Sequence, residues 1–271
     1  MGLFTEWVRF GHGECYSGYF AKPDRDDKEL PSVIVLQEIW GVDEHIQDIT
    51  RRFAQAGYAA FAPALFGENG GYKPGLDPDS VLLLRRFMDG LPHGHWQDPA
   101  KRGEALAAYP EKERVSIETT MKHMFDPAVR ESYIDTALAA SDWLRNERPE
   151  TKGNRIGAVG FCMGGMLSAL LASRDHSLNA SIIFYGSPLQ KEQLSSIACP
   201  VQGHYGELDP GITSKVPEFE AAMEELGKSI EVHVYAGAPH AFFNDGRPTY
   251  RADAAREAFA RTLAFFSEHI G

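Results

Sequence analysis

A cysteine stands between two glycines at the point where a β-like run of residues gives way to a helical one. The motif Gly160-Phe-Cys162-Met-Gly164 follows the apolar residues 156–159 and precedes the helical run 166–172. Gly-x-nucleophile-x-Gly between a strand and a helix is typical of the nucleophile elbow, a turn so tight that the nucleophile has a strained backbone. Glycines two residues before and after it keep side chains from colliding. The pattern therefore predicts that Cys162 is a nucleophile.

An acid and a histidine follow Cys162 in the chain order of this kind of site, which is nucleophile, acid, histidine. Asp209 comes directly behind the strand-like residues 200–206, and His240 comes behind those at 230–235. Both would lie at the carboxyl edge of a sheet, where α/β proteins place their active sites. We expect His240 to take the proton of the thiol and Asp209 to hold the imidazole in the required tautomer.

Each of the three residues also has a simpler interpretation. A buried structural cysteine, an aspartate in a turn, and a capping or core histidine all occur without a catalytic role. Their order, each behind a predicted strand, favours the catalytic interpretation. Three further histidines could suggest a metal site, but no set of ligands with zinc-like spacing completes it. The three histidines are His93, His95 and His123. We therefore expect neither a metal nor a cofactor.

A carboxylate, Glu38, follows the apolar, β-branched run 32–37, which is typical of a buried parallel strand. It would lie at the same edge of the sheet as the three residues above. One interpretation makes it a partner of the thiol that competes with His240. The other makes it a carboxylate at the start of a helix, near Asp43 and Glu44. The residues alone leave both interpretations open.

Two backbone N–H groups are the expected donors to an oxyanion. Met163 directly follows the nucleophile, and Ile39 lies in the loop after the third predicted strand. Hydrolases built on the elbow take their oxyanion-hole donors from these two places. We therefore expect the N–H groups of Ile39 and Met163 to form an oxyanion hole.

The elements around these residues alternate between strands and helices, which predicts an α/β fold with a mostly parallel central sheet flanked by helices. We expect a hairpin near 15–22, strands at 32–37, 58–62, 179–185, 200–206 and 230–235, and helices at about 43–56, 132–148 and 250–269, besides the strand and helix of the elbow.

One stretch, from 67 to about 130, breaks this alternation and is long for a connection. It begins like a loop, turns helical at 80–88, and contains a charged segment at 101–115. We interpret it as an insertion that covers the carboxyl ends of the strands, as a lid would. The alternative is a surface excursion without a catalytic role. Either way, we expect one domain over residues 1–271.

Composition limits the possible partners. A net charge of −11 argues against nucleic acid and anionic membranes. There is no apolar run of the ~20 residues that a membrane span needs, and the first residues do not resemble a secretory signal. Three cysteines without a CxxC motif, Cys15, Cys162 and Cys199, predict free thiols and a cytoplasmic location. We expect a monomer or a small homo-oligomer that acts on a small molecule.

Four motifs make the sequence similar to the dienelactone hydrolase (carboxymethylenebutenolidase) family. They are Gln37–Val42, Gly160–Gly165, the Gly-x-x-Asp that ends at Asp209, and Gly237–Phe242, and the resemblance covers about residues 14–66 and 131–268. It implies an α/β-hydrolase fold and a triad of Cys162, His240 and Asp209. It also implies that Glu38 can hydrogen-bond the thiol until substrate disturbs that contact. The implied reaction is attack on an ester or lactone carbonyl, giving an acyl-enzyme that water resolves, without a cofactor.

The sequence departs from the family pattern at the residue that binds the substrate carboxylate. The family places an arginine four residues after the histidine, and here that residue is Asn244, with Arg247 close by but not equivalent. A second arginine belongs to the inserted region, where Arg85, Arg86, Arg102 and Lys73 are the candidates. For substrate contact we therefore consider Trp40, Tyr185, Asn244 and Arg247. Two alternatives stay open: a thioesterase or other acyl hydrolase on the same triad, and a hydrolase-fold binding protein that does not turn over.

Overall fold

A central sheet of eight strands runs through the computed structural model of the chain, which describes residues 2–25, 29–92, 95–96 and 98–271, with only the backbone at 127, 128 and 131. The strand order is β1-β2-β4-β3-β7-β8-β9-β10. The β1–β2 and β2–β4 pairs are antiparallel and all other neighbours are parallel, which confirms the mostly parallel sheet. The strands are β1 (Leu3–Phe10), β2 (Tyr16–Pro23), β3 (Ser32–Leu36), β4 (Ala59–Pro63), β7 (Ile156–Phe161), β8 (Ala180–Phe184), β9 (Val201–Gly206) and β10 (Ile230–Tyr235).

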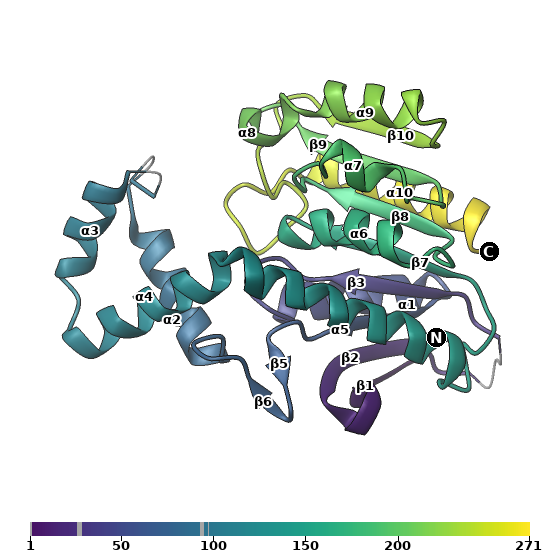
Figure 1. Cartoon of the computed structure of the whole chain (residues 1–271), viewed down its shortest axis with the longest axis horizontal. Coiled ribbons are helices and arrows are strands. Elements are labelled where there is room, and N and C mark those ends of the chain that lie inside the picture. Colours follow the sequence, from purple (N-terminus) through teal and green to yellow (C-terminus); the bar gives the residue numbers. More distant parts are fainter. Residues whose placement is uncertain (1, 26–28, 93–94, 97) are drawn as a thin grey trace.

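Helices cover both faces of this sheet (Figure 1). Successive side chains of a strand point to opposite faces. In β3, Ile34 belongs to the apolar core shared with α5 and α6, whereas Val33 and Val35 belong to the core shared with α1 and α10. Because both faces are buried, the central strands are continuously apolar. The covering helices are α1 (Glu44–Gln55), α5 (Pro127–Asn146), α6 (Met163–Arg174), α7 (Lys191–Leu194), α9 (Val216–Glu225) and α10 (Ala252–His269), and the short η1 (His12–Glu14) and α8 (Pro210–Thr213) lie in connections.

The expected elements are present, with shifted ends. The hairpin consists of β1 and β2, and the helix expected at 132–148 begins five residues earlier, at Pro127. A proline in the first turn of a helix has no hydrogen-bonded N–H to lose, so it is a good starting residue. At the end of α1, Gly57 has a φ of 106°, the left-handed conformation expected of a glycine after a helix.

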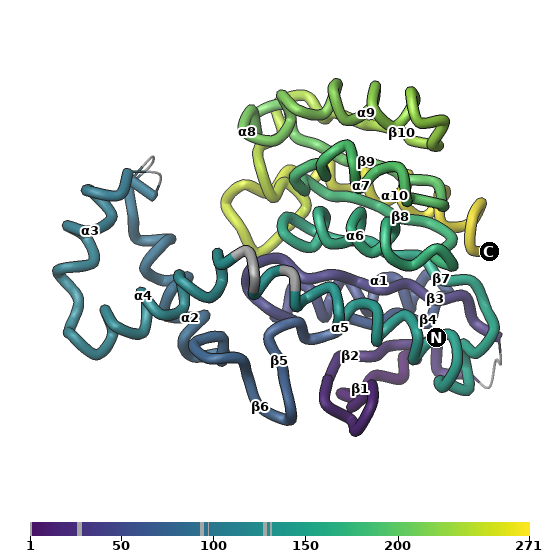
Figure 2. The backbone as a smooth tube through the Cα atoms, in the orientation of Figure 1, coloured from purple at the N-terminus to yellow at the C-terminus, as the bar shows by residue number. Residues whose placement is uncertain are grey.

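The chain leaves the sheet after β4 and returns along α5, as the trace in Figure 2 shows. Between them lie β5 (Gly67–Glu68), β6 (Gly71–Tyr72), α2 (Pro78–Gly90), α3 (Pro99–Ala107) and α4 (Glu111–Phe125). The carboxylates of Asp77 and Asp98 cap the first turns of α2 and α3. These helices project from the end of the sheet that also carries the loop after β10 (Figure 1). Whether the insertion acts as a lid stays a prediction.

Membrane-spanning helices are absent from the part of the chain that the structure describes, since none of its helices is both long and apolar enough to cross a bilayer.

Candidate active site

Cys162 occupies the turn between β7 and α6 with a φ of 55° and a ψ of −115°. Close contacts between backbones impose this turn. A Cβ atom on Gly160 would lie 1.8 Å from the carbonyl oxygen of Gly164, and one on Gly164 would lie 2.2 Å from that of Leu36. Only glycine fits at either position. The strained backbone at Cys162 is therefore held by packing on both sides and holds the thiol at the carboxyl edge of the sheet.

A chain of hydrogen bonds joins the three residues that the sequence singled out. Nε2 of His240 lies 3.2 Å from Sγ of Cys162, and Nδ1 of His240 lies 2.6 Å from Oδ2 of Asp209. The Asp209 side chain is 13% exposed and that of His240 is 37% exposed, so the acid is covered while the base can be reached. The order carboxylate–imidazole–thiol is the arrangement that holds a nucleophile ready for deprotonation.

The charge of His240 depends on the two groups that it contacts. Burial lowers the pKa of its imidazole, but the hydrogen bonds and negative charges of Asp209 and Cys162 outweigh this effect and raise the pKa to about 10. An imidazolium that persists at neutral pH is the partner that a thiolate requires. The contacts of His240 therefore favour its imidazolium form.

Glu38 is also buried, but it forms hydrogen bonds with residues outside the series Asp209–His240–Cys162. The hydroxyl of Tyr185 donates to one carboxylate oxygen at 3.1 Å, and Nδ2 of Asn244 donates to the other at 2.7 Å. Burial, followed by the negative charges of Glu38 and Cys162, raises the pKa of Tyr185 well above its usual range, so the phenol stays a donor. The resemblance implied a contact between Glu38 and the thiol, whereas here His240 bonds the thiol.

The two expected oxyanion donors are the backbone N–H groups of Met163 and Ile39. Met163 is the first residue of α6, where an N–H has no partner within the helix. Ile39 lies in the turn between β3 and α1. Neither N–H donates to an acceptor within the described ranges. Both N–H groups can therefore donate a hydrogen bond to an oxygen of a bound molecule.

Two of the residues considered for substrate contact, Trp40 and Arg247, lie where the insertion meets the site. The guanidinium groups of Arg85 and Arg247 lie 5.5 and 5.6 Å from the centre of the Trp40 ring. Each also pairs with a carboxylate, Arg85 with Asp43 at 3.2 Å and Arg247 with Asp89 at 2.9 Å. The pairs tie α2 to both loops that flank the site. As direct contacts of substrate, Trp40, Arg247 and the buried pair that holds Glu38 stay predictions.

The other candidate cations in the insertion are also engaged or remote. Lys73 donates to the carbonyl oxygen of Leu65, and burial lowers the pKa of its ammonium group. Arg102 donates to the carbonyl oxygen of Trp96 and lies over its ring. Arg86 is exposed on α2.

Metal-binding clusters of three or more His, Cys, Asp or Glu residues do not occur in the described ranges. Of the histidines weighed for a metal, His93 lies outside those ranges. Sequence reasoning did not foresee that Tyr185 and Asn244 would meet at Glu38, because three distant segments converge there and no local pattern reports it.

The strand order and the strained residue at a strand-to-helix turn define an α/β-hydrolase fold. Comparison with known proteins narrows this class. The sequence profile of the dienelactone hydrolase family matches residues 16–270, nearly the whole chain. The chain therefore belongs to the dienelactone hydrolase family, and it is a hydrolase of the class that acts on esters or lactones.

Individual relatives agree with this assignment. A candidate carboxymethylenebutenolidase of Saccharolobus solfataricus is 32% identical over 235 residues, which cover 86% of this chain and 88% of the relative. A candidate 2-oxo-3-(5-oxofuran-2-ylidene)propanoate lactonase of Bradyrhizobium is 29% identical and covers 99% of this chain and 96% of its own. The crystal structure of a candidate dienelactone hydrolase from Klebsiella pneumoniae superposes with a TM-score of 0.67 at 26% identity, over 99% of this chain and 100% of that one.

Proposed function

We propose that the protein is a cysteine hydrolase that cleaves small esters or lactones through an acyl-enzyme on Cys162. The observation that carries the proposal is the unbroken series of hydrogen bonds from Asp209 through His240 to the thiol. The strained position of Cys162 between β7 and α6 supports it further, because that turn presents a nucleophile to the carboxyl edge of the sheet. Family membership supports the substrate class.

Acylation begins from the thiolate of Cys162 and the imidazolium of His240. The sulfur attacks the carbonyl carbon, and the π electrons of the carbonyl move to its oxygen, which accepts hydrogen bonds from the N–H groups of Ile39 and Met163. The tetrahedral intermediate then expels an alkoxide, which takes the proton from Nε2 of His240. A thioester and a neutral imidazole remain.

Water completes the reaction. The neutral imidazole of His240 removes a proton from a water molecule as its oxygen attacks the thioester carbon. The second tetrahedral intermediate expels the Cys162 thiolate, which restores the starting pair. The net reaction consumes one ester bond and one water and yields a carboxylic acid and an alcohol, joined in one molecule if the substrate is a lactone. Throughout the reaction, the carboxylate of Asp209 accepts a hydrogen bond from the Nδ1–H group of His240.

Glu38 supports this mechanism as a positioning residue in the free enzyme. One of its carboxylate oxygens accepts a hydrogen bond from Tyr185 and the other accepts one from Asn244. The thiol of Cys162 is hydrogen-bonded to His240 instead. A carboxylate on the substrate is then not needed to release the thiol. The pairing of Arg85 and Arg247 with carboxylates points the same way, and we propose that the preferred substrates are uncharged.

Location, assembly and domain organisation stay predictions, and we propose them as follows. The three cysteines are free, which supports a reducing compartment such as the cytoplasm. We propose a single domain whose insertion covers the site, acting as a monomer or a small homo-oligomer, with neither nucleic acid nor membrane as a partner.

Replacement of the nucleophile tests the proposal. We expect Cys162→Ala to lower kcat/KM for p-nitrophenyl acetate by ~10³-fold or more, the range found when a member of a catalytic triad is removed. Cys15→Ala is the matched control, because Cys15 lies in the hairpin connection and should leave the activity unchanged. Rapid quenching and mass spectrometry should find one acetyl group on Cys162. Undiminished hydrolysis by Cys162→Ala would end the proposal.

A further inference from the structure

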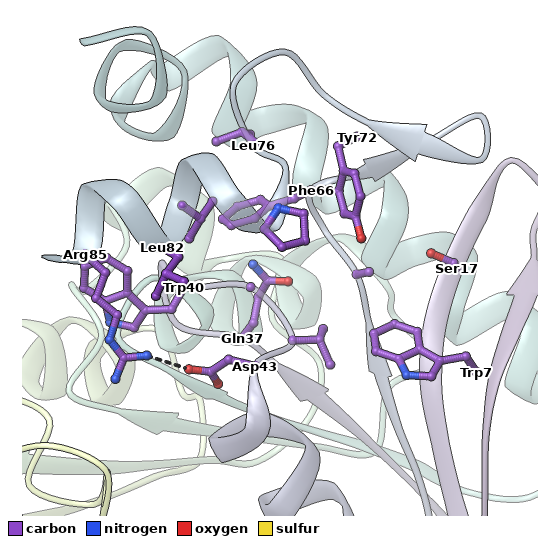
Figure 3. Close-up of a pocket in the computed structure, with 15 residues that line it drawn as sticks. Trp7, Ser17, Gln37, Trp40, Asp43, Phe66, Tyr72, Leu76, Leu82 and Arg85 are labelled. Atoms are coloured by element: carbon purple, nitrogen blue, oxygen red, sulfur yellow. Dashed lines mark hydrogen bonds and ion pairs between the residues drawn. The ribbon is translucent and has the colours of Figure 1, made fainter. Parts of the chain in front are cut away.

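A cavity of about 380 Å³ lies between the insertion, β2 and the segments that follow β3 and β4. Figure 3 shows its walls, with the rings of Trp7, Phe66 and Tyr72 grouped around one space and the Ser17 hydroxyl directed toward it. Small-molecule sites have volumes of roughly 300–1,000 Å³. Cavities of this kind at the carboxyl edge of an α/β sheet are the usual binding sites of the fold.

The lining is predominantly apolar and carries no unpaired charge. Among the described residues that line the cavity, the only charged side chains are those of Arg85 and Asp43, which pair with each other at 3.2 Å. The Gln37 amide oxygen accepts from the backbone N–H of Leu65, so this group is engaged too. The Ser17 hydroxyl donates to no acceptor within the described ranges. A ligand that suits these walls is uncharged, largely apolar, and has at most one or two hydrogen-bonding groups.

Apolar side chains are exposed at this cavity to an unusual degree. Trp7, Tyr72 and Leu82 are 53%, 54% and 44% exposed, and all three line it. They belong to β1, β6 and α2, which are distant in sequence. Exposed apolar groups that gather from separate segments around one hollow mark a binding surface, whereas those scattered singly over a surface carry no such meaning.

The segment that follows β3 connects the cavity with the candidate reacting groups. Leu36 of β3 lies directly opposite Gly160 of β7, and Glu38 and Cys162 each come two residues after this pair, so they lie at neighbouring places. The segment that continues from β3 then divides its side chains. Glu38 accepts a hydrogen bond from Tyr185, which packs against His240, whereas Gln37 and Trp40 line the cavity. Trp40 directly follows Ile39 and lines the cavity, so a molecule whose carbonyl accepts from the N–H of Ile39 could place its remaining portion in the cavity.

We propose that this cavity binds the apolar portion of the ester substrate, and that its aromatic walls make the enzyme selective for esters with an uncharged group as large as a naphthalene ring. This inference rests on the proposed function of Cys162. The cavity thereby sets specificity through side chains that take no part in the chemistry, since none of its lining residues belongs to the triad.

Filling the cavity tests the proposal. Leu82→Trp adds a bulky ring from an exposed position on α2. The matched control is Val115→Trp on α4, where the exposed Val115 lies about 200° around the helix from the buried Ile117, on the side away from the core. Three esters are compared: ethyl acetate without a large group, 2-naphthyl acetate with one on the alcohol side, and ethyl 2-naphthylacetate with one on the acyl side.

We expect Leu82→Trp to lower kcat/KM tenfold or more for at least one naphthyl ester and less than twofold for ethyl acetate, while Val115→Trp changes none of them. Loss for only one naphthyl ester identifies whether the cavity takes the alcohol or the acyl group. An equal loss for all three esters, or no loss for either naphthyl ester, overturns the proposal.

A binding measurement separates this inference from the proposed chemistry. Calorimetric titration of Cys162→Ala with 2-naphthylacetamide needs no turnover. Binding that Leu82→Trp weakens tenfold or more in the same background supports the cavity even if Cys162 proves not to be the nucleophile. Titration without any heat of binding overturns the assignment even if Cys162 is essential for hydrolysis.

Discussion

The elbow and the insertion position side chains by opposite means. At the elbow, backbones touch one another so closely that a single Cβ on Gly164 would lie 2.2 Å from a carbonyl oxygen of β3. In the insertion, a Cβ added to Gly103 of helix α3 would meet no described atom within 4 Å other than its chain neighbours and the nearby backbone of its own helix. The first region has no room for any side chain, whereas the second tolerates one without adjustment.

This difference separates chemistry from specificity. Attack on a carbonyl requires sulfur, base and oxyanion donors to be held within fractions of an ångström, and close backbone packing supplies that rigidity. Recognition of an apolar group requires only walls of suitable size, which side chains from β1, β6 and α2 provide. Substitutions at the elbow should therefore act on rate and stability together, and substitutions in the insertion on neither or on substrate preference alone.

The pair of glycines gives the largest expected contrast. We expect Gly164→Ala to lower the free energy of unfolding by about 3 kcal/mol or more, because the added Cβ meets backbone that no rotamer change can relieve. Activity should fall at least 100-fold. Gly103→Ala, in an exposed helix, should raise the free energy of unfolding by up to about 1 kcal/mol and leave activity unchanged. Urea denaturation and ester hydrolysis measure both; equal effects of the two substitutions would contradict the comparison.

The pH dependence of the base gives the next effect. Because the pKa of His240 is raised to about 10, the imidazolium should persist until the pH passes that value, so kcat/KM should fall as the pH rises through about 10. Asp209→Asn removes a hydrogen bond and a charge that raise this pKa, so the alkaline decline should move to lower pH. The rate should also drop, by ~10²- to 10⁴-fold. If the alkaline decline stayed in place, His240 would not be the group that titrates.

The same linkage applies to stability. A group whose pKa is higher in the folded state stabilises the fold fully below its unfolded value, near 6.5, and loses that contribution as the pH rises toward about 10. The free energy of unfolding should therefore decline across this interval in the parent protein and decline less in Asp209→Asn.

The elbow was predictable from sequence for a physical reason. A strained turn needs glycines at fixed spacing around Cys162, and a parallel sheet brings Asp209 and His240 to the same edge because each follows a strand. The surroundings of Glu38 were not predictable in this way. Asn244 lies 206 residues from it in sequence, and its role as a donor to Glu38 depends on how two loops fold together. From the sequence we could see only that position 244 has an asparagine where the family has an arginine.

The insertion shows the same limit more strongly. A helix was predicted at 80–88, where α2 lies, whereas 101–115 was described only as a charged segment and contains parts of α3 and α4. The cavity beneath it was not predicted, because Trp7 and Tyr72 come from a strand and a short hairpin that meet only in the folded chain. Hence the sequence predicted the reaction class but left the substrate open.

The smallest expected effect concerns Arg247, which lies at the junction of the two regions. Asp89 holds its guanidinium at 2.9 Å, and a partly exposed ion pair contributes only about 0–1 kcal/mol. We expect Arg247→Met to change KM less than threefold for ethyl acetate and for monoethyl succinate, which carries a carboxylate. Asp89→Asn, the control, should free the arginine and lower KM for monoethyl succinate alone. If Arg247→Met instead raised KM tenfold for monoethyl succinate only, Arg247 would bind the carboxylate despite its partner, and the insertion would recognise charge as well as apolar surface.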